Sequence, residues 1–363
     1  MRPDDLKSRI TAIIMMFVVA VSVMAFPCSK TYAASGSTGS KITFRESNFR
    51  KLKNRTVRGR SLGINLRSMI GESSGGYSIV QGGCTDGKYA YYLMVSGSTQ
   101  HGRVLKVRMK DKKVVKRSGV LNTWHGNGMT YDSKRKRLVV IAREDRKQEI
   151  TCIDANTLKI TKQQNVRYTH YKDAGIYSMS PYHQRQGLAA IAYVKKYDCY
   201  IALERVAHNL IIINPNNFQA IGFAVTRISS DYPGTFQAMD ADEKYVYLLL
   251  SQYQSDPSAQ PYNIILAIDW NSEKMLPVVN AKHRDRVYAK YAWYCGNKND
   301  GKQDAVIRVK TPYEAENIYH IKQKGTKGKG HFYLSEYHGH SVYSNGRYQY
   351  FGRDDYVYDL GTF

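Results

Sequence analysis

Acidic residues are scarce in this chain, and short motifs that mark common enzyme classes are missing. The 363 residues include 54 Lys and Arg but only 30 Asp and Glu, which leaves a formal net charge of +24. No HExxH or P-loop segment occurs, so the sequence argues against a zinc protease of that type and a P-loop nucleotide-binding protein. The 5 cysteines form no CxxC pair and no zinc-ligand spacing, which argues against a structural zinc site.

Amphipathic helical periodicity is also missing after about the first 40 residues, which predicts an all-β protein. The residues that are present fit this class. Hydrophobic residues make up 42% of the chain, and 30 residues are Tyr. Tyr suits half-buried strands, because its ring packs on the sheet while its hydroxyl reaches water.

Only the N-terminus carries a long apolar run. A charged start precedes the apolar segment 10–26, and Pro27 and several small residues follow it. This pattern predicts a secretion signal over residues 1–34, cleaved near Ala33 or Ala34. The alternative is an uncleaved anchor helix, because about 17 apolar residues are near the lower limit for a membrane span. Since no second run appears, we expect a secreted protein, free or associated with the cell wall, without an integral membrane segment after processing.

A strand-turn-strand phrase recurs four times in the chain. Each copy has a short apolar strand, a polar turn built on Asp or Asn, and a second strand. The copies lie about 45–60 residues apart, a period typical of stacked or radial repeats. They read VLKVRMKDKKVV from Val104, ITCIDANTLKI from Ile150, LIIINPNNFQAI from Leu210 and IILAIDWNSEKM from Ile264.

Another apolar strand precedes each copy, and a loop with Gln or His beside Gly or Ala precedes that strand. One unit therefore has about four strands, the size of one blade of a β-propeller. We predict a single propeller over residues 68–363 with five four-stranded antiparallel blades, and six blades as the alternative. The basic segment 35–67 is predicted to be a flexible leader that adds a strand to the closing blade, which would remove an open sheet edge.

Polar side chains recur in the loops that lead to the inner strand of each predicted blade. These loops should meet at one mouth of the axial channel, because inner strands line the axis of a propeller. Amide groups beside aromatic rings suit hydrogen bonding to a sugar or a short peptide, although amides in tight turns also satisfy backbone groups. The predicted ligand-binding residues are Gln81, Trp124, His125, Asn127, Gln186, Gln237 and Glu316.

A second candidate site lies in the segment HFYLSEYHGH from His331. Glu336, His338 and His340 alternate along it, which predicts that they share one face of a strand. Together with His125 they would supply acid–base catalysis or metal ligands in an envelope-active lyase or hydrolase. Exposed polar strand faces show the same alternation, so we predict no bound metal and no cofactor, and an enzyme is the alternative interpretation.

Carboxylates are too few at the predicted mouth for a typical glycosidase, which needs two of them beside the scissile bond. Glu316 is the single acid there. Four other acids follow inner-strand phrases but fit the turn pattern of Asp, and they are interpreted as turn residues: Asp86, Asp132, Asp240 and Asp242. The shortage of a second acid favours binding over hydrolysis.

The large positive charge indicates the class of partner rather than the fold. For an exported protein the natural counterparts are anionic cell-wall polymers or glycans, whereas no nucleic-acid-binding motif is present. The alternative is a basic surface that only aids solubility. We expect a monomer. The four cysteines that follow the signal leave their pairing open, although Cys152 and Cys199 lie in apolar strand patterns that predict buried thiols.

The phrases QGGCTDGKYAYY and HGNGMTYDSKRKRLVV resemble secreted propellers of Gram-positive bacteria. The groups concerned are the helveticin-J-like bacteriocins and the propellers associated with teichoic acid synthesis. The resemblance covers residues 75–279 and implies a five- or six-bladed propeller that binds the cell envelope. It carries over Gln81, His125, Asn127 and Gln237 as mouth positions.

This chain differs from those groups in its cleavable signal and its higher positive charge. The main interpretation is therefore a secreted, cationic, non-catalytic propeller that binds an anionic or glycan component of the bacterial envelope. A bacteriocin-like activity is the third interpretation, after the envelope-active enzyme.

Overall fold

The computed structural model describes most of the predicted propeller. It covers residues 55–71, 76–96, 101–142, 148–167, 178–179, 187–205, 208–226, 235–243, 245–252, 262–270, 274–275, 287–288, 291–295, 305–310, 314–322, 330–337, 340–344, 347–351 and 355–362. The predicted secretion signal lies outside these residues. Within them, no helix has the length and apolar character that crossing a membrane requires.

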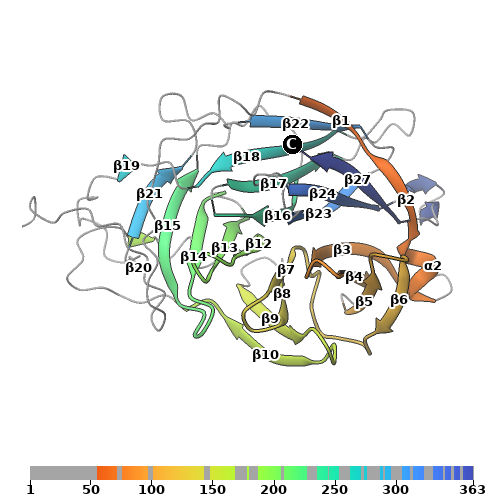
Figure 1. The fold of residues 1–363 in the computed structure, drawn as a ribbon, viewed down its shortest axis with the longest axis horizontal. Coiled ribbons are helices and arrows are strands. Elements are labelled where there is room, and N and C mark those ends of the chain that lie inside the picture. The colour runs from red at the N-terminus through yellow and green to blue at the C-terminus, as the bar shows by residue number, and fades with distance from the viewer. Residues whose placement is uncertain are drawn as a thin grey trace, which may run out of the picture.

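Four-stranded antiparallel sheets repeat five times around a common axis, so the protein is a five-bladed β-propeller (Figure 1). The first blade consists of β3 (Tyr77–Thr85), β4 (Tyr89–Ser96), β5 (Gly102–Arg108) and β6 (Lys113–Arg117). The second consists of β7 (Met129–Asp132), β8 (Arg137–Ile141), β9 (Glu149–Asp154) and β10 (Ile160–Asn165). The third consists of β12 (Leu188–Val194), β13 (Cys199–Glu204), β14 (Leu210–Ile213) and β15 (Ala220–Thr226).

The last two blades use strands that are far apart in the sequence. The fourth consists of β16 (Thr235–Ala241), β17 (Tyr245–Gln252), β18 (Tyr262–Asp269) and β22 (Ala305–Lys310). The fifth consists of β23 (Glu314–Lys322), β24 (Gly330–Tyr337), β27 (Tyr356–Thr362) and β2 (Arg60–Asn65). The predicted fold class is confirmed, and the number of blades is five rather than six.

The inner strands form a closed ring around the axis. β3, β7, β12, β16 and β23 each contact the next, and β23 contacts β3 again. Figure 1 shows these five strands meeting at the centre of the molecule. A ring of only five strands is narrow, and glycines allow its close approaches. A Cβ on Gly128 would lie 3.1 Å from the Ala190 Cα atom, and the φ of Gly128 is +77°, where side chains are strained.

Strands from near both ends of the described residues meet in the fifth blade. β2 pairs antiparallel with the C-terminal strand β27. The Arg60 Nη2 atom lies 2.9 Å from the Asp359 Oδ2 atom, and the other oxygen of Asp359 contacts the ring of His331 on β24. A short helix, α2 (Leu66–Ile70), then leads from β2 toward the first blade. β2 is therefore the outer strand of the closing blade, and β27 pairs with β2 on one side and with β24 on the other.

Short strands extend the blades at the periphery. β1 (Arg55–Arg58) runs parallel to β22, and β21 (Tyr291–Cys295) runs parallel to β15. β19 (Lys274–Met275) pairs with β21, so the fourth copy of the strand-turn-strand phrase does not form the expected pair with β18. β22 takes that place instead. Two separate two-stranded sheets consist of β11 (Ser178–Met179) with β20 (Val287–Tyr288), and β25 (His340–Ser344) with β26 (Arg347–Phe351).

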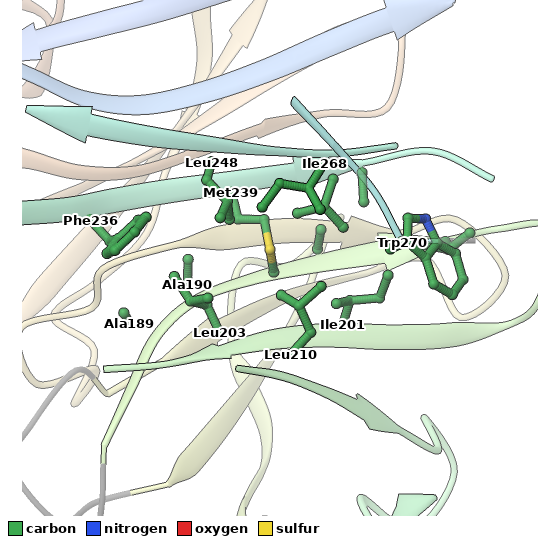
Figure 2. Close-up of a cluster of buried hydrophobic side chains, with 14 of the residues drawn as sticks. Ala189, Ala190, Ile201, Leu203, Leu210, Phe236, Met239, Leu248, Ile268 and Trp270 are labelled. Atoms are coloured by element: carbon green, nitrogen blue, oxygen red, sulfur yellow. The ribbon is translucent and has the colours of Figure 1, made fainter. Parts of the chain in front are cut away.

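Five clusters of buried side chains fill the five spaces between neighbouring blades. Alternate residues of the middle strands point to opposite neighbours, because successive side chains of a strand face opposite sides. In β13, Ile201 and Leu203 pack toward the fourth blade, whereas Tyr200 and Ala202 pack toward the second. Because both faces of each middle strand are buried, the middle strands have continuous apolar runs in the sequence. Figure 2 shows the third-to-fourth interface, where Ile201, Leu203 and Leu210 face Met239, Leu248 and Ile268.

Ion pairs join the second blade to the third. Asp198, in the turn after β12, lies 2.7 Å from Arg135 Nη1 and 2.5 Å from Lys134 Nζ, both of which follow β7. Burial alone would raise the pKa of Asp198, but hydrogen bonds from Arg135, Lys134 and Tyr193 lower it to about 2. The Asp198 carboxylate is therefore held in its charged form by the neighbouring blade.

The inner-strand turns use Asp as the sequence predicts. Asp86, Asp132 and Asp242 each accept a hydrogen bond from the backbone N–H three residues later. Asp240 is different. It lies in β16, and its Oδ2 atom is 2.6 Å from the Nδ1 atom of His320 in the neighbouring blade. The interpretation of Asp240 as a turn residue is wrong, because the strand continues through it.

Candidate functional site

A single position in each blade brings a side chain to the axis. The pairing of four inner strands is interrupted by one extra residue at equivalent points, and in β7 the matching residue is Asn127, just before the strand. Such β-bulges turn a side chain out of the regular alternation. We call these five residues the axial ring: Gln81, Asn127, Ala189, Gln237 and Glu316.

The axial ring is buried, and two of its members, Asn127 and Gln237, bind each other across the axis. The Asn127 Nδ2 atom donates to Gln237 Oε1 over 3.2 Å, and the Gln237 Nε2 atom donates to Glu314 Oε1 over 2.8 Å. This chain links the second, fourth and fifth blades. The third blade contributes no side chain to these hydrogen bonds, because its axial residue, Ala189, has no polar group. The four polar members are only 0–5% exposed, so they close the axis rather than line an open mouth.

The structure brings together four of the residues predicted to bind a ligand: Gln81, Asn127, Gln237 and Glu316. Their role in ligand binding stays a prediction. Glu316 is not the single acid in this region, because Glu314 and the fully buried Glu336 belong to the same blade. The repeat pattern gives no signal for Glu314, because this residue has no counterpart in the other blades.

The other predicted members lie elsewhere. Trp124 donates from Nε1 to Glu149 Oε1 over 3.0 Å, which ties it to the start of β9 in its own blade. His125 follows it in the same loop and is half-buried. Gln186 lies outside the described residues, and Ala189 occupies the axial position of the third blade.

The proposed His/Glu cluster does not share one strand. Glu336 is in β24 and His340 begins β25, which belongs to a separate two-stranded sheet. His338 lies between them, outside the described residues. The expected alternation on one face is therefore wrong, because strand pairing ends at Tyr337. In the part of the chain that the structure describes, no three His, Cys, Asp or Glu residues could hold a metal ion.

One further motif match has an unsuitable context. Residues 71–75 read GESSG, which fits GxSxG. In hydrolases this motif stands in a sharp turn from a strand into a helix. Here Gly71 ends helix α2, and the next described element is strand β3. The described elements on either side of the motif therefore stand in the reverse order, and residues 72–75 lie outside the described residues.

A pocket of about 520 Å³ opens on the axis beyond the axial ring. All five inner strands line it, together with the turns that follow β3, β7, β12 and β16. The pocket begins at Gly83, Met129, Met239 and Ile318, each two residues after a member of the axial ring. Because the inner strands run in the same direction, the axial ring closes the floor of this axial pocket. Its mouth lies among the turns, with Asp86, Ser133, Lys195, Lys196, Asp242 and Glu243.

The pocket wall contains an Asp–His pair and a buried thiol. The backbone N–H of His320 and its Nδ1 atom each lie 2.6 Å from Asp240 Oδ2, and the ring stacks on Phe332 at 5.3 Å. Burial raises the pKa of the Cys84 thiol, and the charges of Asp240 and Asp86 raise it further. The thiol therefore stays protonated at neutral pH, which makes it a poor nucleophile. Cys84, Cys152 and Cys199 are all buried and free.

Positive charge gathers on the first two blades. Residues 103–167 contain 18 Lys and Arg against 6 Asp and Glu, a net +12 of the chain's formal +24. Among the described residues of this span only one acid, Asp111, is exposed. We call the exposed bases of this span the basic edge: Lys110, Lys112, Lys113, Lys116, Arg117, Lys134, Lys136, Lys159, Lys162 and Arg167.

The basic edge is continuous from one blade to the next. The Nζ atom of Lys116, on the outer strand β6, donates to the carbonyl of Asn156 in the second blade over 2.7 Å. The turns that carry Lys112 and Lys136 lie at the same end of their blades, because neighbouring strands are antiparallel. The outer strands and the turns of both blades thus form one positively charged surface.

Comparisons with known proteins show no family for this chain. No protein-family model matches the chain, and no curated protein matches it. The chain is similar in structure to a glutaminyl cyclase of Myxococcus xanthus, with 10% identity, a TM-score of 0.44, and coverage of 86% of this chain and 100% of that one. It is also similar to the Cps50 (Swd1) β-propeller domain of Myceliophteria thermophila, with 11% identity, a TM-score of 0.35, and coverage of 77% and 98%. Likeness at this level carries no activity over to this chain.

Proposed function

We propose that this protein is a secreted β-propeller that binds an anionic polymer or glycan of the bacterial cell envelope and leaves it chemically unchanged. The observation that supports this is the position of the charge. Half of the net positive charge lies on 65 of 363 residues. A basic surface that served only solubility would not require such concentration, whereas a surface that binds a polyanion would.

The basic edge suits a long anionic partner better than a small one. Its lysines stand on paired strands and short turns, which fix the positions of their backbones, and the residues are exposed. A chain of phosphates or carboxylates that lies along β6 and β10 would contact several of them at once. Each contact is weak and screened by salt, so affinity comes from their number.

The axial ring does not meet such a polymer first, because its side chains are buried. Binding at the basic edge therefore requires neither the amide groups of the axis nor His125. We expect His125→Ala to leave envelope binding unchanged.

The test is co-sedimentation of the purified mature protein with intact cell walls, with and without their teichoic acids, over a salt series. We expect binding that disappears when the anionic polymer is extracted and that is lost near about 0.5 M salt, where the Debye length falls to a few Å. Walls without the polymer that bind equally well, or no binding at low salt, would contradict the proposal. Release of soluble sugar from the walls would point to the enzyme instead.

A further inference from the structure

We propose that the axial pocket binds a small organic amine and that its carboxylates hold the ammonium group. This site is separate from the basic edge and does not depend on polymer binding. Its volume of about 520 Å³ is that of a small-molecule site, and every blade contributes to its wall. The wall is therefore formed before a ligand arrives.

The charge of the pocket is opposite to that of the whole chain. Four acids line it against two lysines, Lys195 and Lys196, in a protein of net charge +24. The acids come from the first and fourth blades, and they are Asp86, Asp240, Asp242 and Glu243. A concave site with low-dielectric walls concentrates such a field, so it favours a cation over the anions that the outer surface attracts.

Hydrogen bonds fix two of the carboxylates in position. Asp86 accepts hydrogen bonds from the backbone N–H groups of Lys88 and Tyr89 and from the Tyr91 hydroxyl. These bonds hold the group without cancelling its charge. Asp240 is held by His320 in the neighbouring blade.

Two of these acids, Asp86 and Asp240, line the pocket together with the Cys84 thiol. The charges of Asp240 and Asp86, from the fourth and first blades, both raise the pKa of the Cys84 thiol. Their fields therefore overlap inside the pocket. An ammonium group placed there would interact with both carboxylates, although they come from different blades.

The remaining wall suits an organic cation. Tyr131, Tyr193 and Tyr319 line the pocket beside the acids, and aromatic rings stabilise ammonium groups as well as apolar carbons. In the described residues no cluster of His, Cys, Asp or Glu could hold a metal ion. The chemistry therefore favours an amine of the size of an amino sugar or an amino alcohol.

The test is calorimetric titration of the full protein with glucosamine, ethanolamine and putrescine, each paired with the form in which every amine is N-acetylated. We expect at least one free amine to bind and its acetylated form to bind at least about ten-fold more weakly, because acetylation removes the charge. If no amine binds at millimolar concentration, or if the acetylated forms bind equally well, the proposal is wrong.

Variants with opposite expected effects separate charge from folding. Asp240→Asn should weaken amine binding about ten-fold, and Glu243→Gln in the turn should weaken it less while leaving the strands intact. The double variant Lys195→Gln/Lys196→Gln should tighten binding, because it removes the competing positive charges. Asp111→Asn removes an equal charge outside the pocket and should change nothing. A pocket that is insensitive to both the acid and the lysine variants does not recognise an ammonium group.

Discussion

Single polar residues hold the axis of the propeller together. The amides that suggested a ligand-binding mouth are buried, and Asn127 of the second blade donates directly to Gln237 of the fourth blade across the axis. Narrow five-bladed rings leave little space at the axis, so polar side chains there meet one another instead of water. The same residue types could bind a ligand in a wider channel. The width of the axial channel cannot be read from the sequence.

Removing the cross-axis hydrogen bond should cost stability. Asn127→Ala leaves the buried amide of Gln237 without one of its partners, and the expected loss in the free energy of unfolding is about 1–3 kcal/mol. Urea unfolding measures it. Asn122→Ala in the same loop is the control, because Asn122 is exposed. Equal stability of the two variants would show that the axial contact contributes nothing.

Asp198 should make the protein sensitive to acid. Its pKa is about 2 in the folded protein and about 3.9 in an unfolded chain. A lowered folded-state pKa contributes stability that is fully present above about pH 4 and is lost as the pH falls toward 2. The difference in unfolding free energy between wild type and Asp198→Asn should therefore be constant at neutral pH and shrink below pH 4. A difference that does not vary with pH contradicts this role.

At the scale of elements, outer strands have two different roles. β2 joins the chain ends in the fifth blade, and its Ile64 is completely buried against the first blade. β6 is also an outer strand, but its Val115 is 41% exposed. One outer strand closes the ring, whereas the other presents its side chains to solvent.

Equivalent truncations on these two strands should have unequal effects. Ile64→Ala should lower the free energy of unfolding by about 2–4 kcal/mol, because it leaves a cavity at the closure. Val115→Ala should change it by less than about 0.5 kcal/mol. Thermal and urea unfolding of both variants test this. If Ile64→Ala is as stable as Val115→Ala, β2 does not close the propeller.

The sequence predicts the middle strands of the blades well and the long-range additions poorly. Apolar runs such as 137–141 and 199–204 are buried on both faces, and this leaves a clear local pattern. β22 completes the fourth blade from a distant part of the chain, and no local pattern records that it joins β18. Period-two alternation also failed at Glu336 and His340, because it does not reveal where a strand ends.

The candidate sites show the same limit. Positions of the axial ring recur in the repeated loops, so four of them could be found by residue type. The third-blade position could not, because Ala189 carries no polar group. The Asp240–His320 pair joins two blades, and neither residue stands in a motif. Charge concentration on residues 103–167 is visible in the sequence, but only the fold places those residues on one surface.

At the scale of the whole molecule, the position of charge rather than its total should decide what the protein binds. We take a basic-edge variant with four substitutions, Lys113→Gln, Lys116→Gln, Lys159→Gln and Lys162→Gln. The control removes the same charge from the third and fourth blades, with Lys195→Gln, Lys196→Gln, Arg308→Gln and Lys310→Gln. All eight side chains are exposed, so both variants should fold.

The most direct measurement is the affinity of wild type and these two variants for soluble teichoic acid at a fixed low salt concentration. The basic-edge variant should bind at least about ten-fold more weakly, since each lysine near a polyanionic surface contributes about 1 kcal/mol. The control variant should stay within about two-fold of wild type. Equal losses in the two variants would contradict the account, because net charge alone, and not the surface of the first two blades, would then govern binding.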